Sequence, residues 1–502
     1  MDKVWVEFLL RLLYNKLIER QMTIFMSKRS QSQEQRRNML LNEPISRIIP
    51  KMAIPTIVAF LINSIYSLAD TYFVSSLGTQ ATAAVSVNAS LDQLIMMCGS
   101  LLAVGANSYI ARLLGQGNDK RASQTLSTAF FTAMGIGAVL MVFGSIFMRP
   151  MVRLLGATAS CERYSVDYAR YVLMAAPFMA ANFVMNQCLR SEGSATLSMV
   201  GMGFGGILNC ILDPILIFGT EGLRQRYGIA LPFDIPAMEV AGASLATAIS
   251  KWVSFAILIF PYLTRRSLLR LSPKNIRFDK ELVTEIATVG SSSLLRNGLA
   301  VVAGIALNAI AGNISDSVLA AVGVCTKVLM FPFGIILGFA TGFQPVAGFN
   351  WGAKRYDRVR ESFRFSARVA VIMGVIMAVV LTVFSDTFIV AFAGTDGEMR
   401  RIGRICMITQ AIALPIHGWV AVVNMYCAGL GDAKGALALS TARQGSCFLP
   451  ILFPLAWLFQ AIGIALVQGL ADVLSLGLAL PILKKLQRKI DAAEKAGRES
   501  HV

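Results

Sequence analysis

Twelve apolar stretches follow one another along this 502-residue chain, and each is long enough to cross a lipid bilayer. A helix needs about 20 apolar residues to do so, and an open strand edge cannot lie in lipid because its backbone groups would be unpaired. The sequence therefore predicts an all-α integral membrane protein with twelve transmembrane helices. The predicted spans are residues 48–74, 82–111, 124–148, 166–189, 195–218, 239–263, 282–311, 317–348, 366–390, 402–428, 435–457 and 461–483.

Composition and charge agree with this prediction. Hydrophobic residues make up 55% of the chain and charged residues 15%, whereas soluble proteins carry about 25% charged residues. The net charge of +17 comes mainly from Lys and Arg in the short connections, where such residues set membrane topology. With the N-terminus inside, 31 of the 46 Lys and Arg lie in cytoplasmic segments. We therefore expect a cell (inner or plasma) membrane protein with both termini cytoplasmic and no nucleic-acid partner.

The two halves of the chain repeat one another at an offset of 237 or 238 residues. The matched pairs are Gly105 and Gly342, Gly115 and Gly352, Pro177 and Pro415, Asn186 and Asn424, and Gly193 and Gly431. Six predicted spans, an even number, separate the copies, so the halves are parallel repeats related by an axis along the membrane normal. Such pairs usually enclose a central site that opens alternately to either side.

The repeat and the loops predict the domain organisation. It comprises a cytoplasmic N-terminal extension (1–47), an N-lobe of six helices (48–263), a cytoplasmic linker (264–281), a C-lobe of six helices (282–483) and a cytoplasmic tail (484–502). Residues 1–25 mix apolar and basic side chains, as in a helix that lies on the membrane surface. The alternative is that translation starts at Met26.

Two carboxylates inside the predicted spans are the strongest functional candidates, because a charge at mid-membrane costs about 3 kcal/mol on insertion scales. Asp70 lies in the first span and Asp213 in the fifth, each a few residues before the outer end. At similar depth, they can share a proton or hold a cation. Asn209 lies one turn before Asp213 on the same helix face, and Pro214 can bend that helix beside the acid.

Other polar residues complete this candidate ion site. Tyr168 can donate a hydrogen bond to a carboxylate, and Thr247 supplies a hydroxyl group. The repeat places Leu307 and Ile451 where the first half has its two acids, so we expect ion handling in the first half only. Asp92 is a weaker candidate, because we expect it near the outer surface.

The second half carries basic residues in its spans, including Arg296, Lys327 and Arg443. The 23 methionines and 29 phenylalanines are compatible with an adaptable apolar cavity. We take Arg296, Gln344 and Met185 as candidate substrate contacts.

Lys251 and Asp472 occupy equivalent positions in the two halves when Gly242 is aligned with Gly463. These two residues either pair with each other or reach an interface separately.

The sequence contains few of the residues and motifs that enzymes use for catalysis. The only histidines are His417 and His501, and the chain lacks HExxH, GxSxG, CxxC and P-loop motifs. We therefore expect neither an enzyme nor a bound cofactor, and we expect the eight cysteines to be inert.

Several motifs, in order along residues 41–485, resemble the multidrug and toxic compound extrusion (MATE) family. They are Leu-Ala-Asp-Thr-Tyr-Phe-Val at 68–74, Leu-Arg-Ser-Glu-Gly at 189–193, Asn209-x-x-x-Asp213-Pro214, Ala-Ser-Leu-Ala-Thr at 243–247 and Gly-Phe-Gln-Pro-x-x-Gly-Phe-Asn-Trp-Gly at 342–352. The family usually has Gly where this chain has Ser191, in a cytoplasmic turn that holds no ion ligand.

The resemblance implies a V-shaped pair of six-helix bundles that exports organic, often cationic, compounds in exchange for H⁺ or Na⁺. In the branch with acids in the N-lobe, the coupling residues correspond to Asp70, Asp213, Asn209, Thr247 and Tyr168, with the Ala243 carbonyl and Asn186 as further contacts. If the ion is Na⁺, Asp70, Asp213, Asn209 and Thr247 are the expected metal ligands. We expect a monomer surrounded by membrane lipid, with a small organic substrate.

The alternative is a flippase of lipid-linked precursors with a related fold. It would need a cationic cavity to meet a pyrophosphate, for which the basic residues of the second half leave room. Such flippases often have more than twelve spans, which favours the antiporter. The sequence leaves both coupling ions open, because the same oxygen atoms suit H⁺ and Na⁺.

Overall fold

The computed structural model of the protein describes residues 34–227, 232, 234–393 and 396–499. The expectations for residues 1–25 and for a start at Met26 lie outside these residues. Within them the secondary structure is helical, as predicted. The helices are α2 (Ile45–Ser75), α3 (Thr79–Gly115), α4 (Asp119–Ile146), α5 (Met148–Leu154), α6 (Glu162–Ser191), α7 (Ala195–Tyr227), α8 (Glu239–Leu263), η1 (Pro273–Asn275), α9 (Lys280–Ile314), α10 (Asp316–Gly352), α11 (Tyr356–Val383), α12 (Ser385–Ala393), α13 (Gly397–Leu430), α14 (Ala433–Thr441), η2 (Ala442–Ser446) and α15 (Phe448–Glu499).

The helix boundaries confirm the internal repeat. Helices α3, α4 and α5 begin at residues 79, 119 and 148, and α10, α11 and α12 begin at 316, 356 and 385, each 237 positions later. Helix α14 begins 238 positions after α7. Even the short helices α5 and α12, which the sequence did not predict, obey the repeat.

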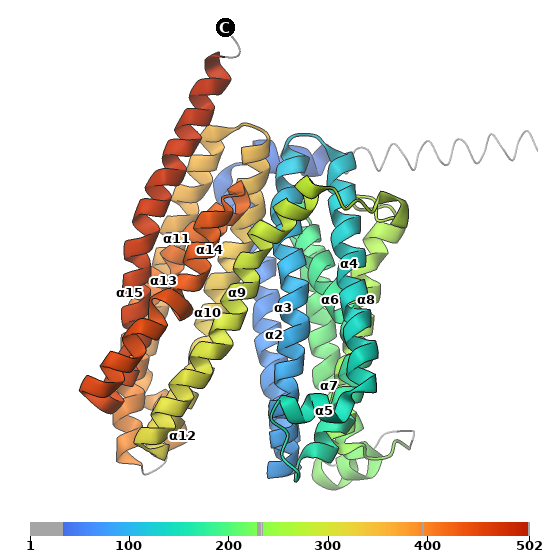
Figure 1. The fold of residues 1–502 in the computed structure, drawn as a ribbon, viewed down its shortest axis with the longest axis vertical. Helices are drawn as coiled ribbons and strands as arrows, with labels where there is room; N and C mark the ends of the chain where they lie inside the picture. Colours follow the sequence, from blue (N-terminus) through green and yellow to red (C-terminus); the bar gives the residue numbers. More distant parts are fainter. Residues whose placement is uncertain (1–33, 228–231, 233, 394–395, 500–502) are drawn as a thin grey trace, which may run out of the picture.

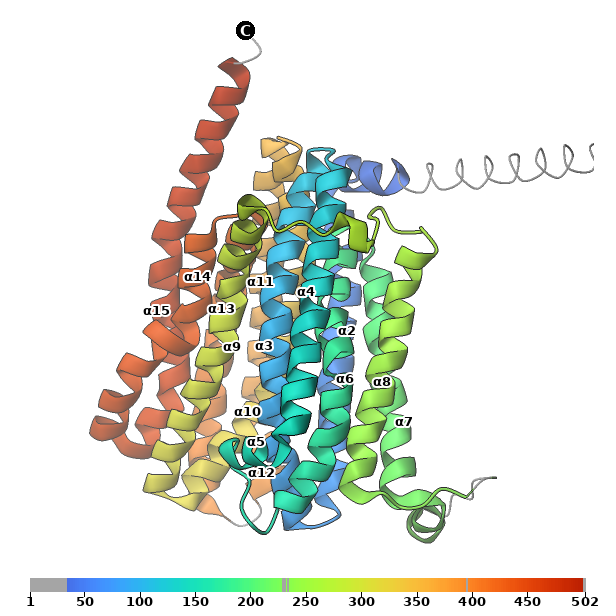
Figure 2. The ribbon, with the colours of Figure 1, turned by 45° about the vertical axis from the view of Figure 1, so that its right-hand side comes forward.

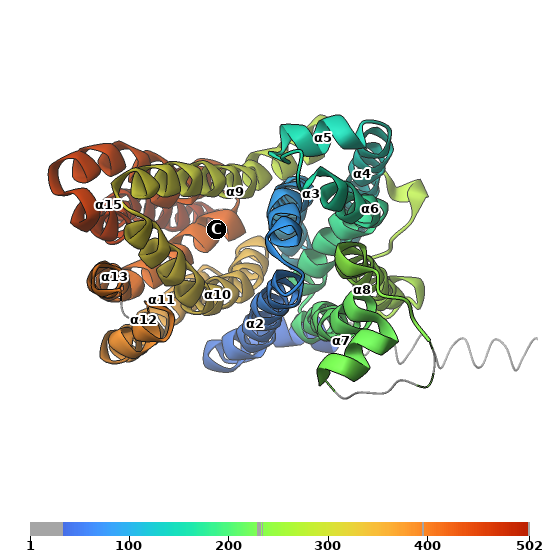
Figure 3. The same cartoon turned by 90° about the horizontal axis from the view of Figure 1, so that it is seen from below.

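The helices form two bundles arranged as a V. The N-lobe (α2–α8) and the C-lobe (α9–α15) meet near the end of the molecule where residue 34 and Glu499 lie, and diverge toward the opposite end (Figure 1). We call these the terminal end and the distal end. Figure 2 shows the linker between α8 and α9 running across the terminal end, and Figure 3 shows the two bundles side by side.

Eleven helices in the described part of the chain are long and apolar enough to span a membrane. The last of them, running from residue 433 to 499, contains two spans because the backbone breaks helical geometry at Gln460, where φ is 48°. Gly463 permits this tight reversal, since a Cβ there would lie 1.9 Å from the Leu455 oxygen. The structure thus has the twelve spans expected.

The ninth span is the least well predicted. We expected residues 366–390, but the helix begins at Tyr356 and ends at Val383. The arginines of its first three turns look like a loop in the sequence; in the structure they project from a helix that extends beyond the apolar layer. In the same way α15 continues to Glu499, through residues expected to form a tail.

Four glycines allow the lobes to touch at the terminal end. A Cβ on Gly105 of α3 would lie 2.1 Å from the Ile286 oxygen of α9, and one on Gly290 would lie 2.0 Å from the Leu101 oxygen. Gly115 and Gly352 are equally close to backbone oxygens across the α3–α10 contact. Any side chain here would force the helices apart, so this glycine seam holds the terminal end closed.

Residues 34–44 form a strap across the terminal end that joins the lobes. Leu40 is fully buried, and its carbonyl oxygen accepts a hydrogen bond from Asn350 of α10 at 3.3 Å. Arg358 of α11 donates to the Glu43 oxygen at 2.7 Å, and on the N-lobe side Arg37 pairs with Asp119. The strap therefore ties both bundles together.

Replacing Arg358 by Ala should destabilise the protein by about 1–3 kcal/mol, because the buried Leu40 carbonyl and the half-buried Glu43 carbonyl lose a charged donor. Thermal unfolding in detergent measures the effect. Arg360→Ala is the matched control: it lies two residues away, but its ion pairs with Asp491 and Glu494 lie at the surface, where such pairs contribute at most about 1 kcal/mol. Equal effects of the two substitutions would contradict the role of the strap.

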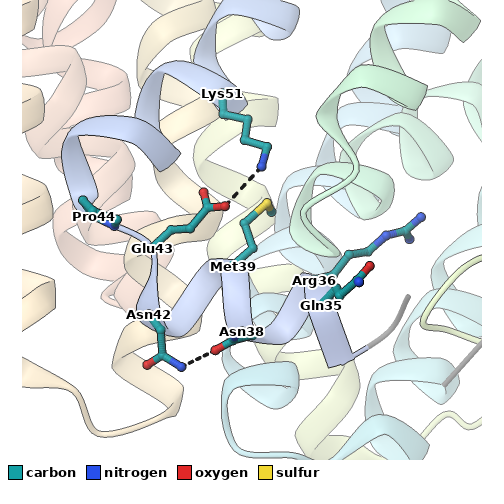
Figure 4. A pocket seen from close by; sticks show the side chains of 8 residues that line it. All are labelled: Gln35, Arg36, Asn38, Met39, Asn42, Glu43, Pro44 and Lys51. Carbon is teal, nitrogen blue, oxygen red and sulfur yellow. Dashed lines mark hydrogen bonds and ion pairs between the residues drawn. The ribbon is translucent and has the colours of Figure 1, made fainter. Parts of the chain in front are cut away.

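The strap also borders an open hollow of about 670 Å³ beside the start of α2. Figure 4 shows its lining, in which Lys51 and Glu43 lie 3.4 Å apart and Asn42 bonds Asn38. None of the predicted site residues lines it. Its position at the terminal end separates it from the acids described below.

The turn between α6 and α7 buries Glu192 completely. Its Oε2 accepts hydrogen bonds from Ser267 at 2.5 Å and from the Leu268 amide at 2.8 Å, so the turn is fixed to the linker. Burial raises the pKa of Glu192 to about 7, against the bonds from Ser267 and Leu268 and the nearby charge of Arg36, which lower it.

This pKa predicts a pH-dependent stability. Between about pH 4.5 and 7 the native state holds one more proton than the unfolded state, so the free energy of unfolding should fall as pH rises, by about 3 kcal/mol in all. Unfolding midpoints at pH 5 and pH 8 measure it. The Glu192→Gln variant should lack this component, and an unchanged pH dependence in that variant would disprove the assignment.

Candidate functional site in the N-lobe

Helix α7 carries the centre of the candidate site. Asp213 and Asn209 are 0% and 2% exposed and lie one turn apart on the face of α7 that packs against α8. The Asn209 amide nitrogen lies 3.2 Å from Asp213 Oδ1 and 3.2 Å from Thr247 Oγ1 of α8. The structure thus brings together three of the predicted ion-coupling residues.

Asp70 approaches this group from α2, which packs against α7. The Asp70 and Asp213 carboxylates lie close enough for their charges to interact. The hydroxyl of Tyr168 on α6 also lies within range of both charges. Tyr168 is 3% exposed and Ala243 is fully buried on α8. Pro214 and Gly219 shape α7 beside the acid: Gly219, at φ 65°, turns the chain out of the helix five residues beyond Pro214.

Unpaired acceptor atoms are the chemical signature of this site. Asp70 Oδ1, Asp213 Oδ2 and Asn209 Oδ1 are buried and have no hydrogen-bond partner among the described residues. Burying an acceptor without a partner costs about 1–3 kcal/mol, and more for a charge. Three such oxygens in one lobe fit a proton or a cation that supplies the missing interaction.

Two more charged residues, Asp92 and Lys251, lie near this group. Asp92 was only a weak candidate from the sequence, and Lys251 was not predicted to belong to the ion site. Asp92 of α3 interacts electrostatically with Asp70, and its Oδ1 is also buried and unpartnered. Lys251 of α8 donates to the Tyr66 hydroxyl at 3.1 Å and lies near Asp92. Asp92 lies thirteen residues into α3 rather than at its outer end. Lys251 does not pair with Asp472, which bonds Arg443 in the other lobe.

The predicted substrate contacts come from three helices, α6, α9 and α10. Asn186 lies near the terminal end of α6, where it donates to the Ser198 oxygen and accepts from Arg190. Met185 is fully buried in the N-lobe core, and Gln344 is 1% exposed, with its backbone oxygen close to Gly429. Arg296 of α9 donates to Ser293 at 3.2 Å.

The oxygen atoms of the site indicate which kind of ion it can hold. Within the described ranges, no three His, Cys, Asp or Glu side chains form a group that could hold a metal. Carboxylate, amide and hydroxyl oxygens from Asp213, Asn209 and Thr247 do lie together. The residues therefore fit a monovalent cation with mixed oxygen ligands, or a proton, better than a centre built from several acids.

A family model described as MatE matches residues 55–215 and 293–458 of this chain. The chain belongs to the MatE family, the MATE transporters. It is therefore a multi-pass membrane transporter and not an enzyme.

Several individual proteins resemble this MATE transporter. The multidrug export protein MepA of Staphylococcus saprophyticus is 25% identical over 446 residues, which cover 88% of this chain and 94% of the relative. An FAD transporter of Shewanella oneidensis is 28% identical over 336 residues, covering 67% of this chain and 72% of that protein.

Solved structures show the same fold. One described as an outward-facing conformation of a multidrug resistance MATE family transporter superposes with a TM-score of 0.81 at 21% identity, covering 91% of this chain and 98% of the other. A transporter of the MOP superfamily from Pyrococcus furiosus gives a TM-score of 0.79 at 21% identity, with the same coverage. The V-shaped arrangement of two six-helix bundles is thus the MATE fold.

Proposed function

We propose that this MATE transporter is a secondary antiporter that exports small organic compounds, often cationic, in exchange for H⁺ or Na⁺ by alternating access. The observation that carries the proposal is the set of buried, unpaired carboxylate and amide oxygens on α2 and α7. A positive ion supplies the interactions that these buried acceptor oxygens lack. Its binding therefore lowers the free energy of the lobe. The name of the related multidrug export protein supports the substrate class.

Each residue of the ion site has a separate role in this proposal. Asp70 and Asp213 bind the coupling ion, because their interacting charges are relieved when one acid is protonated or when both hold a cation. Asn209 donates to Asp213 and to Thr247, so it orients the carboxylate, and the Ala243 carbonyl and Tyr168 complete the site. An ion that binds one conformation better than the other shifts the equilibrium toward it. Pro214 lets α7 bend when the charge of the lobe changes.

The terminal end faces the cytoplasm in this proposal, and the distal end faces outward. Its basic side chains support this orientation, including those of the linker at residues 264–281. The glycine seam and the strap then close the cytoplasmic side, and the cycle requires both to open. The transporter works as a monomer, since each lobe supplies one half of the pathway.

Transport in proteoliposomes tests the function. The purified protein is reconstituted, and the movement of ethidium is followed after a pH gradient or a Na⁺ gradient is imposed separately. Movement under one gradient identifies the ion. Movement under neither gradient would refute coupled export of organic cations.

The second candidate is a lipid-linked precursor flippase, which the basic residues Arg296, Lys327 and Arg443 of the C-lobe favour. A scrambling assay with a fluorescent pyrophosphate-linked lipid in the same proteoliposomes distinguishes it from the antiporter.

A further inference from the structure

The C-lobe contains a polar cluster whose unpaired atoms are donors, whereas those of the candidate ion site in the N-lobe are acceptors. Arg443 Nη2 and Gln468 Nε2 are buried hydrogen-bond donors without a partner among the described residues. Gln468 lies one turn before Asp472 on the same face of α15. These two unpaired donors would form their strongest hydrogen bonds with a negatively charged acceptor.

Contacts from three helices hold Arg443 in place. Its Nε donates to Asp472 Oδ1 of α15 at 2.8 Å, and its guanidinium lies 4.1 Å from the ring centroid of Phe333 of α10. His417 of α13 packs edge-on against Phe333 and places Nδ1 3.8 Å from Asp472 Oδ1. Asp472 uses only part of the guanidinium, which has five N–H donors in all. The remaining donors are oriented by these contacts.

The local backbone also sets this residue apart from its counterpart in the N-lobe. Arg443 lies in η2, a π-helical turn at Ala442–Ser446, and such turns occur often at functional sites. The repeat places Gly205 at the equivalent position of α7, where a Cβ would lie 1.9 Å from Ser254 Oγ. Tight packing in one lobe is thus replaced by a charged side chain, 18% exposed, in the other.

The charge of the lobe is not balanced at this depth. Arg296, Lys327, Arg368 and Arg443 lie in the middle parts of the C-lobe helices, and Asp472 is the one carboxylate among the described residues there. Arg443 lies ten residues beyond the start of α14, or about 15 Å along the helix. That depth is near the middle of a hydrocarbon core of about 30 Å, so the headgroup of a bilayer phospholipid does not reach it.

We propose that Arg443, with Gln468 and His417 beside it, forms a subsite that binds an anionic group, a carboxylate or a phosphate, of the exported compound. The proposal rests on the export function given above and adds zwitterionic and anionic organic molecules to its substrates. Asp472 and Phe333 orient the guanidinium and do not contact the substrate. The N-lobe binds the coupling ion, and the C-lobe recognises the negative group of the cargo.

Rhodamine B and its ethyl ester test this subsite, because they differ only in whether the benzoate is free. Fluorescence anisotropy with the purified protein in detergent measures both affinities. Wild-type protein should bind the free acid at least about tenfold more tightly, the size expected for one charge-assisted hydrogen bond. The double variant Arg443→Gln/Asp472→Asn removes both charges without leaving a buried one unpaired, and should bind acid and ester within about twofold of each other.

Two further variants make the result specific. Arg443→Lys keeps the charge but loses the planar donor array, so it should keep only part of the preference. Lys327→Gln, the matched control, removes an exposed cation from the same lobe and should change the preference by less than about twofold. Ester binding by the double variant, together with an unchanged elution profile, shows that it is folded.

Equal affinity of wild-type protein for acid and ester, absence of acid binding, or a preference that survives in the double variant would overturn the proposal. The measurement needs no ion gradient. A failure of coupled export therefore leaves its outcome unaffected, and the two proposals fail separately.

Discussion

Substituting Asp213 by Asn is expected to abolish gradient-driven export while leaving the protein folded. Asn nearly matches Asp in shape but cannot take up a proton or hold a cation with a full charge. Asn209 can still bond the residue at 213, because its amide nitrogen donates to Oδ1, which an asparagine retains. The buried site also loses a charge that is costly to desolvate, so stability should stay equal or rise.

The Asp70→Asn variant should give the same loss, because one coupled pair of carboxylates binds the ion. Initial rates of ethidium movement in proteoliposomes should fall at least about a hundredfold in either variant, to the rate of passive leak. Glu162→Gln is the control: it removes an acid near the distal end whose partner, Arg153, lies at the surface. Normal export by either aspartate variant would refute the assigned ion site.

Replacing Gly290 by Ala should open the terminal end. The new Cβ would lie 2.0 Å from the Leu101 oxygen, and because this neighbour is backbone, α9 and α3 must separate. Overpacking of this kind typically costs about 1–3 kcal/mol, enough to move a two-state equilibrium roughly tenfold or more. Gly304→Ala, on the same helix with no atom within 4 Å of its Cβ position, makes the same chemical change without a clash.

Thiol labelling reads out this opening. In a background without the native cysteines, Ser108→Cys places a thiol in the seam, where the native side chain is 1% exposed and bonds the Ala428 oxygen. A membrane-impermeant maleimide should label it about tenfold faster in Gly290→Ala than in Gly304→Ala. Equal labelling rates would mean that the seam does not control access.

The sequence predicted those features that depend on local hydrophobicity. The sixth span, predicted at residues 239–263, coincides with α8, because polar loops flank a single apolar run. The ninth span was misplaced because charged residues near Arg360 belong to a helix that continues beyond the apolar layer. The spacing of apolar residues along a sequence reveals which helix faces are buried. A helical turn that is exposed has no apolar face, so the sequence does not reveal that it is helical.

The candidate site divides in the same way. Asp213 and Asn209 share one helix face, so their contact follows from spacing alone. The bond from Lys251 to Tyr66 joins helices separated by 185 residues, and nothing in either local sequence indicates it. The glycines of the seam were visible as a repeat, but their function needed the second backbone that lies against them.

The contacts of the seam also have a consequence for the symmetry of the chain. Gly115 lies against the Phe349 oxygen and Gly352 against the Arg112 oxygen; residues 112 and 115 are the repeat equivalents of 349 and 352. This reciprocity defines an isologous interface, the kind that joins two identical subunits. The seam thus has the symmetry of a contact between two copies of one half-length chain. Because both copies belong to one chain, they can differ away from the seam: one lobe carries Asp70 and Asp213, and the other carries Arg443.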